Sequence, residues 1–189
     1  MVALQLVQEF KDLDISILKS IFENRNPAFD IILRAITNTA AAIAFGIPGI
    51  LLIHAFIKKN QVNQLRAIQL LIPVALSAIV ANVLKYAIDL PRPYELYPFI
   101  HKLSVGGSPS FPSGHTADAF AFATGISLMY RKWIVVVLVL LWASLVGYTR
   151  MALGVHFPSD VLAGALVGVL CSYAVYRFMQ SKYTKPPLG

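Results

Sequence analysis

Residues 35–57 contain no aspartate, glutamate, lysine or arginine, and this long uncharged run restricts the fold more than any other feature of the chain. A helix of about 20 apolar residues crosses the ~30 Å hydrocarbon layer of a membrane. Further apolar runs follow at residues 67–84, 113–130, 133–149 and 158–177. The sequence therefore predicts an all-α integral membrane protein, built as a bundle of about five transmembrane helices.

The composition supports a membrane protein of a single domain. The chain has 189 residues, of which 57% are hydrophobic and 13% are charged, whereas soluble domains average about 25% charged residues. Its net charge of +7 is not gathered into a basic stripe, so we expect an anionic membrane lipid as partner rather than nucleic acid, and no obligate protein partner. Cys171 is the only cysteine, which excludes a disulfide framework or a cysteine zinc site.

The N-terminal segment has a different pattern. Residues 4–22 place apolar side chains at helical spacing but also carry several charges, which is typical of an amphipathic helix at a membrane interface. Asn26 and Pro27 are suited to cap and begin a second helix. We therefore divide the single domain into interfacial helices at 1–34 and a transmembrane bundle at 35–180, with six crossings if the second N-terminal helix also spans. The segment lacks the basic start and the long apolar run of a signal peptide, so we expect no cleaved leader.

The charges between the apolar runs predict the orientation. With five crossings, the segments 58–66, 131–132 and 177–185 share one side, and all three contain basic but no acidic residues. The positive-inside rule assigns that side to the cytoplasm. The opposite, exterior face then receives the N-terminal helices and the residues Lys85, Arg92, His115, Arg150, His156 and Asp160.

The segment 147–160 carries three polar residues that can act as acids, bases or fixed charges. Arg150, His156 and Asp160 lie between apolar runs, where ionisable groups are costly and indicate function. Asp160 follows His156 by four residues and falls in the first turn of the helix that Pro158 begins. Its carboxylate can accept a hydrogen bond from one imidazole nitrogen, leaving the other free to attack. The alternative is a buried polar cluster that caps a helix.

Two further segments are expected at the same face. Lys85 and Arg92 end the second apolar run, where snorkelling basic residues are also common. Ser113, Gly114 and His115 begin the third, and the free N–H groups of a helix start form an anion site. Three cations, a helix N-terminus and two histidines suit a phosphate group.

Together these segments resemble a known family. Lys85-x6-Arg92-Pro, Pro-Ser-Gly-His115 and Arg150-x5-His156-x3-Asp160 are similar, in this order, to the three signature motifs of the type 2 phosphatidic acid phosphatase (PAP2) superfamily. The multi-span layout resembles its bacterial lipid-phosphatase branch. One departure is Thr149, because the third motif usually begins Ser-Arg; threonine keeps the hydroxyl, so we expect its role to be retained.

The resemblance implies a two-step mechanism without metal or cofactor. It assigns His156 as the nucleophile that forms a phosphohistidine, Asp160 as the group that orients it, and His115 as the acid that protonates the leaving oxygen and then activates water. The implied phosphate-binding groups are Lys85, Arg92, Arg150 and the backbone around Ser113 and Gly114. The nine acidic residues are scattered, and no cluster resembles a two-metal site.

The resemblance places the protein in a bacterial inner membrane, with the active site facing the periplasm or exterior. It leaves three substrates open: an isoprenyl pyrophosphate, phosphatidylglycerol phosphate and the 1-phosphate of lipid A. Two other functions also stay open, a lipid phosphotransferase and a non-enzymatic phospholipid-binding or transport protein. Asp118, one turn after His115, either orients that histidine or is a plain helix-start acid. Gly164 and Gly168 predict close helix packing.

Overall fold

The computed structural model describes residues 2–107 and 109–183, and helices form nearly all of this part of the chain. In chain order they are α1 (Val2–Glu23), a 3-10 turn η1 (Pro27–Phe29), α2 (Asp30–Ala41), a π-helical stretch η2 (Ala42–Gly46), α3 (Ile47–Ile57), α4 (Gln61–Ile88), α5 (Pro93–Leu96), α6 (Gly114–Tyr130), α7 (Trp133–Ala152) and α8 (Pro158–Tyr183). Within the described ranges there is no strand. The prediction of an all-α membrane bundle is confirmed.

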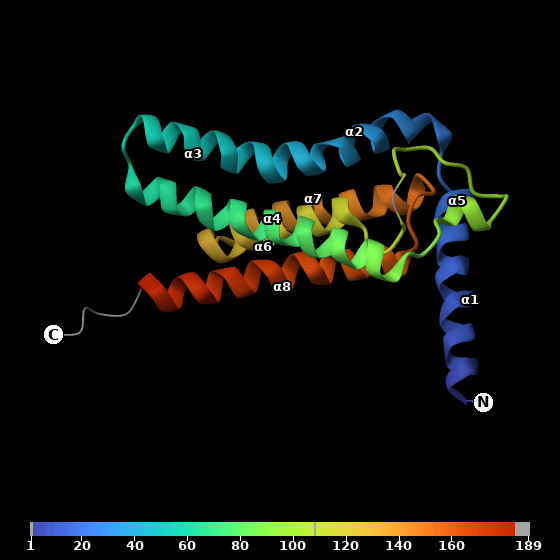
Figure 1. Ribbon diagram of the computed structural model, residues 1–189. Coiled ribbons are helices and arrows are strands. Elements are labelled where there is room, and N and C mark those ends of the chain that lie inside the picture. Colours follow the sequence, from blue (N-terminus) through green and yellow to red (C-terminus); the bar gives the residue numbers. More distant parts are fainter. Residues whose placement is uncertain (1, 108, 184–189) are drawn as a thin grey trace.

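Four helical segments are long and apolar enough to cross a membrane: Pro27–Ile57, Gln61–Leu96, Trp133–Ala152 and Pro158–Ser181. The fifth predicted crossing, α6, is shorter at 17 residues. It lies inside the bundle beside α4, α7 and α8, with Ala117, Ala119, Ala121 and Ala123 fully buried. Its small side chains allow the neighbouring helices to approach closely, and α6 thereby forms the centre of the protein (Figure 1).

The helical segment that contains the first crossing begins earlier than the expected boundary at residue 35. Asn26 caps it, because its side-chain oxygen accepts a hydrogen bond from the N–H of Ala28 at 3.0 Å, and Pro27 follows as the first helical residue. Asp30 pairs with Arg25 at 3.3 Å, which offsets the cost of a carboxylate near the membrane end of the helix. Residues 27–34 are thus continuous with the helical segment Pro27–Ile57 that contains the first crossing, and where this segment enters the membrane stays a prediction.

The proline inside this first crossing marks a change in helix type. The π-helical stretch η2 ends at Gly46, two residues before Pro48. A proline has no N–H for the bond to the preceding turn, and wider turns accommodate such a defect. A π-helical stretch between α2 and α3 thus accommodates Pro48.

Helix α1 lies across one end of the bundle, roughly at right angles to the other long helices (Figure 1). Leu18 and Phe22 are buried against Ile100, while Phe10 is 59% exposed. Asp14 joins α1 to the start of α8, since its carboxylate accepts hydrogen bonds from the N–H of Ser159 at 2.9 Å and from its hydroxyl at 2.6 Å. The amphipathic character is present; that α1 lies in the membrane interface remains a prediction.

The two ends of the bundle differ in composition. The α3–α4 turn, the α6–α7 turn and the C-terminal end of α8 lie together at one end, and α1, α5 and the long loop 97–113 lie at the other (Figure 1). The basic segments are therefore at one end and the candidate catalytic segments at the opposite end, as the count of crossings predicted.

Two glycines of α8 determine how closely it packs on α6. A Cβ atom on Gly164 would lie 2.4 Å from the carbonyl oxygen of Ser113, and one on Gly168 would lie 2.3 Å from that of Ala117. Both are far below the van der Waals distance, so any side chain at either position would separate the helices. The predicted packing role of this glycine pair is confirmed, and it holds Asp160 of α8 beside Ser113 at the start of α6.

Candidate active site

The three motif segments converge at the end of the bundle covered by α1. Lys85 comes from the last turn of α4, His115 from the first turn of α6, Arg150 from the last turn of α7 and Asp160 from the first turn of α8. His156 lies in the connection between α7 and α8. The charged groups are buried: Lys85 is 6% exposed, Arg92 3%, Arg150 1% and Asp160 1%. Buried charges are retained only where partners compensate them.

His156 is held between a carboxylate and a guanidinium. Its Nδ1 lies 3.3 Å from Oδ2 of Asp160, and its Nε2 lies 3.3 Å from NH1 of Arg92. A guanidinium can only donate, so Nε2 is the acceptor and the ring proton resides on Nδ1, where it points at Asp160. This arrangement defines the tautomer whose Nε2 lone pair faces the cations of the site.

Burial also keeps His156 uncharged. The pKa of His156 is lowered to about 3, mainly by its removal from water. The hydrogen bond and the charge of Asp160 raise this pKa, whereas the positive charges of Arg150 and Arg92 lower it. The imidazole is therefore neutral at physiological pH, and a neutral imidazole is the nucleophilic form.

Asp160 is fixed by more groups than the sequence suggested. Besides His156, its Oδ2 accepts hydrogen bonds from the hydroxyl of Ser110 and from the N–H of Phe157, the latter at 2.9 Å. Three contacts on one oxygen fix the orientation of the Asp160 carboxylate beside His156. Ser110 lies two residues before Pro112, the first residue of the Pro-Ser-Gly-His motif, and is fully buried; our sequence analysis missed it, although it stands close to a recognisable motif.

Arg150 links three parts of the chain. Its NH1 donates to the hydroxyls of Thr37 at 2.9 Å and Ser104 at 3.3 Å, and its NH2 donates to the carbonyl of Val105 at 2.9 Å. Its Nε has no hydrogen-bond partner among the described residues. A buried guanidinium N–H without an acceptor is costly, and an anion in the site would supply one. The neighbouring Thr149 hydroxyl donates within its own helix, to the carbonyl of Val146 at 2.6 Å.

Lys85 and Arg92 complete a cationic cage around His156. The Lys85 ammonium donates to the carbonyls of Pro109 at 2.6 Å and Ser110 at 3.4 Å. Arg92 donates to the carbonyl of Val155 at 2.7 Å. Neutral carbonyls anchor both cations without cancelling their charge, so the cage retains a positive potential.

The start of α6 carries the expected N-cap residue, Ser113. Its N–H donates to the carbonyl of Asp160 at 2.9 Å, and its hydroxyl pairs with that of Thr116 at 2.8 Å. That the backbone around Ser113 and Gly114 binds phosphate stays a prediction. The N–H groups of Gly114 and His115 lie in the first turn, which has no preceding helical acceptors, and a Cβ on Gly114 would meet no atom within 4 Å.

His115 belongs to the same electrostatic environment, since the charges of Arg150, Arg92 and Lys85 all act on it. Asp118 does not bond to His115; its Oδ1 lies 3.3 Å from the hydroxyl of Ser77 on α4. This hydrogen bond joins α4 to α6, and the two roles considered for Asp118 stay predictions.

Similarity to known proteins agrees with this geometry. The model of the PAP2 superfamily matches residues 66–184. The chain belongs to the PAP2 superfamily. Phosphatidylglycerophosphatase B of Bacillus subtilis is 31% identical over 177 residues, which cover 87% of this chain and 82% of that protein. Among solved structures, LpxE of Aquifex aeolicus superposes with a TM-score of 0.76 and 30% identity, covering 87% of this chain and 95% of that one.

A third relative of this PAP2 protein is named as a lipid A phosphatase and matches over a shorter segment. The lipid A 4'-phosphatase of Bacteroides thetaiotaomicron is 38% identical over 79 residues, or 42% of this chain and 35% of that protein. The matches to the lipid A 1-phosphatases of two Rhizobium species cover 42% and 40% of those proteins. This chain thus spans less than half of the length of these relatives.

The PAP2 site contains no evident metal-ligand cluster. Among the described residues, no group of three or more histidine, cysteine, aspartate or glutamate side chains is placed to hold a metal ion.

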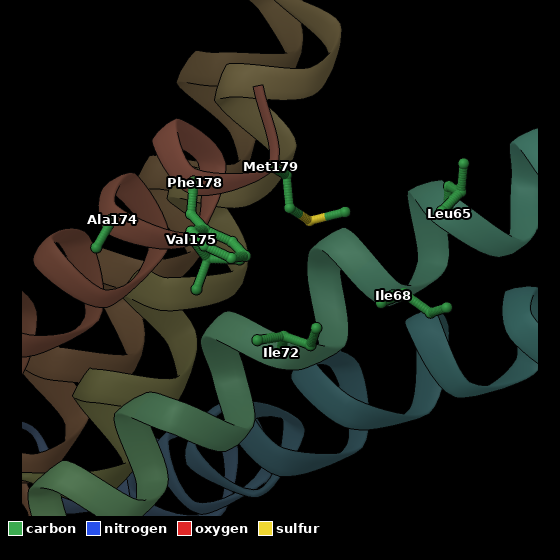
Figure 2. Close-up of a pocket in the computed structure, with 7 residues that line it drawn as sticks. All are labelled: Leu65, Ile68, Ile72, Ala174, Val175, Phe178 and Met179. Carbon is green, nitrogen blue, oxygen red and sulfur yellow. The ribbon is translucent and has the colours of Figure 1, made fainter. Parts of the chain in front are cut away.

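A hollow of about 420 Å³ lies between α4 and α8 (Figure 2). Its lining, including Ile72 and Phe178, is apolar and offers no catalytic side chain. It lies away from the cationic cage.

Gly106 provides a local test of the cage. A Cβ at this position would lie 2.8 Å from NH1 of Arg92, whereas one at Gly107 would meet nothing within 4 Å. Gly106→Ala should displace the guanidinium and lower kcat/KM for phosphate release by roughly 10- to 100-fold, because small displacements of such groups have effects of this size. Gly107→Ala is the matched control and should retain the parent value. Equal rates for the two variants, both folded by thermal unfolding, would contradict the contact.

Proposed function

We propose that this protein is a lipid phosphate phosphatase that removes a terminal phosphate from a membrane lipid through a phosphohistidine. The observation that carries the proposal is the placement of His156 between Asp160 and Arg92, with Nε2 as the acceptor nitrogen. Membership in the PAP2 superfamily and the phosphatase names of its relatives support it.

In the first step, Nε2 of His156 attacks phosphorus while Asp160 stabilises the positive charge that develops on the imidazole. A P–N bond forms and the bond between phosphorus and the lipid oxygen breaks. The departing oxygen takes a proton from His115. Arg92, Arg150 and Lys85 stabilise the equatorial oxygens, which is the main contribution expected from fixed charges in a site removed from water.

In the second step, water attacks the phosphohistidine and gives its proton to His115. The P–N bond breaks, inorganic phosphate leaves, and both histidines return to their starting states. The chemistry is supplied by side chains alone, and uncatalysed hydrolysis of phosphate monoesters is slow enough to require acceleration of up to ~10²¹-fold. Preorganised cations account for a large part of such an effect.

The function is tested with purified protein and a panel of three lipids: an isoprenyl pyrophosphate, phosphatidylglycerol phosphate and a lipid A bearing a 1-phosphate. We expect release of inorganic phosphate from at least one of them in excess chelator. A rate that collapses with chelator and returns with magnesium would contradict the metal-independent mechanism. Transfer of phosphate to another lipid without its release would identify a phosphotransferase, and tight binding without either reaction would identify a binding protein.

We further propose that the cage faces the exterior of a bacterial inner membrane, because the basic turns and the C-terminal end of α8 lie at the other end of the bundle (Figure 1). A cysteine introduced at Gly107 should react with an impermeant reagent added to intact spheroplasts, and a reporter fused after residue 182 should be active only in the cytoplasm. Labelling and reporter on the same side would contradict the orientation.

A further inference from the structure

A second hollow lies directly beside the cationic cage. It has a volume of about 700 Å³ and is formed by the first turns of α2 and by the loop 102–107. Its lining contains two cations, Arg34 and Lys102, together with the amide of Asn38 and the hydroxyl of Ser104. Among the described residues of this lining there is no acidic side chain. Ligand sites commonly have volumes of this order.

The hollow and the cage share their walls. Arg150 donates to Thr37, which lies between Arg34 and Asn38 on α2, and to Ser104 and Val105 of the loop. The backbone of Gly106 rests against the guanidinium of Arg92. The two arginines of the cage thus contact residues that line the hollow, so a group that enters the hollow would lie close to the cage.

The nearby acidic groups are already engaged elsewhere. Asp30 pairs with Arg25 at 3.3 Å, and Glu95 accepts a hydrogen bond from the backbone N–H of Arg92 at 2.9 Å. Lys102 lies over the ring of Tyr94, with its ammonium 5.2 Å from the ring centre, and the Tyr94 hydroxyl donates to the carbonyl of Gly106 at 3.0 Å. This aromatic contact holds the Lys102 ammonium beside the loop that lines the hollow. The hollow therefore carries two cations and further polar groups, next to the apolar side chains of Leu103 and Val105.

We propose that this hollow, with Arg34 and Lys102 as its cations, binds a second phosphate of the substrate lipid, distinct from the phosphate that is cleaved. The inference rests on the proposed phosphatase function and narrows its substrate to lipids with two phosphates. The second phosphate is either attached directly to the first, as in a diphosphate lipid, or separated from it by a glycerol or sugar unit. Neither cation touches the reacting atoms, so the hollow contributes to binding and not to the chemical step.

The test compares three substrates in mixed micelles of fixed surface charge: phosphatidic acid with one phosphate, an isoprenyl pyrophosphate with two attached phosphates, and phosphatidylglycerol phosphate with two separated ones. Arg34→Gln and Lys102→Gln should each raise KM for a two-phosphate lipid about tenfold, which is a reasonable effect for one lost charge-assisted hydrogen bond. KM for phosphatidic acid and all kcat values should stay near the parent values. The two-phosphate lipid that shows the effect identifies how the phosphates are arranged.

The controls separate a local site from general attraction to anionic micelles. Lys58→Gln and Lys132→Gln remove exposed charges at the opposite end of the bundle and should change no KM. Arg34→Lys and Lys102→Arg should restore most of the affinity. An equal rise in KM for all three lipids, or no change for either two-phosphate lipid, would overturn the proposal.

Failure of the subsite can be distinguished from failure of the proposed function. If the parent protein releases phosphate but the variants do not discriminate among the lipids, only the subsite is wrong. If the parent releases phosphate from none of them, the phosphatase function is wrong; equilibrium binding of the same lipids then tests the hollow, and loss of selective binding in the Gln variants is still required.

Discussion

His156→Ala protein should form no phosphoryl-enzyme and should release phosphate about 10⁶-fold more slowly than the parent, the loss typical of removing a catalytic nucleophile. The reason is geometric: Nε2 of His156 faces the guanidinium of Arg92, and the Nδ1 proton points at Asp160. No other imidazole in the described chain has a carboxylate partner of this kind. Alanine removes the only atom proposed to bond to phosphorus.

The measurement is base-quench trapping with lipid labelled at its terminal phosphate, because phosphohistidine survives base but not acid. Asp160→Asn is the informative companion variant. It keeps the nucleophile but loses the negative charge that stabilises the developing imidazolium, so we expect labelling at a rate about 10⁴-fold lower, as in triad enzymes. Label retained on His156→Ala protein would remove His156 as the nucleophile.

The pH dependence gives an independent check of the same step. Burial holds the pKa of His156 at about 3, below the ordinary value of about 6.5. Because the lowered pKa favours the neutral form, acidification to about pH 5 should not protonate His156. The rate of phosphoryl-enzyme formation should therefore not fall with an apparent pKa of about 6.5, the value expected for protonation of an ordinary histidine. Complete loss of labelling below pH 6 that tracks His156 protonation in NMR spectra would contradict the buried environment.

Much of the site was visible in the sequence because its residues lie in short local patterns. The four-residue step from His156 to Asp160 and the helix start at Pro158 bring two partners together within one turn. Counting crossings then placed Lys85 and His115 at the same end. These inferences needed only helix geometry and the alternation of the chain between two faces.

The missed contacts depend on packing between distant segments. Ser110 binds Asp160 across 50 residues, and Thr37 binds Arg150 across 113. Neither residue belongs to a recognisable pattern with its partner, and a serine or threonine in an apolar helix more often bonds to its own backbone. Such contacts follow from the tertiary arrangement, so a single sequence does not reveal them.

The helix that contains the first crossing also depends on a contact that local patterns do not reveal. The sequence groups residues 27–34 with the interfacial segment 1–34, whereas the structure joins them to residues 35–57 in one helical segment, with Asp30 paired to Arg25. A charged residue with a partner near the end of a helix costs much less than an isolated one. The pairing partner lies outside the helix, before the Asn26 cap, where a hydrophobicity window does not consider it.

The remaining large effect concerns His115, which is proposed to act on the leaving oxygen. General acid catalysis contributes about 10²- to 10⁴-fold, and its contribution grows with the basicity of the leaving group. The alkoxide of a lipid alcohol is a poor leaving group, whereas a pyrophosphate expels a comparatively acidic phosphate. His115→Ala should therefore slow hydrolysis of a monophosphate lipid by about 10³-fold or more and that of a pyrophosphate lipid much less.

The measurement is the ratio of variant to parent single-turnover rates for the two lipids, which isolates chemistry from product release. His54→Ala is the matched control, since that histidine is exposed at the opposite end of the bundle and should alter neither rate. The phosphoryl-enzyme should still form on His115→Ala protein, because His156 and its partners are intact. An equal loss on both lipids under single-turnover conditions would remove His115 as the acid and leave it a phosphate-binding group, since a binding contact to the transferred phosphate is the same whichever lipid leaves.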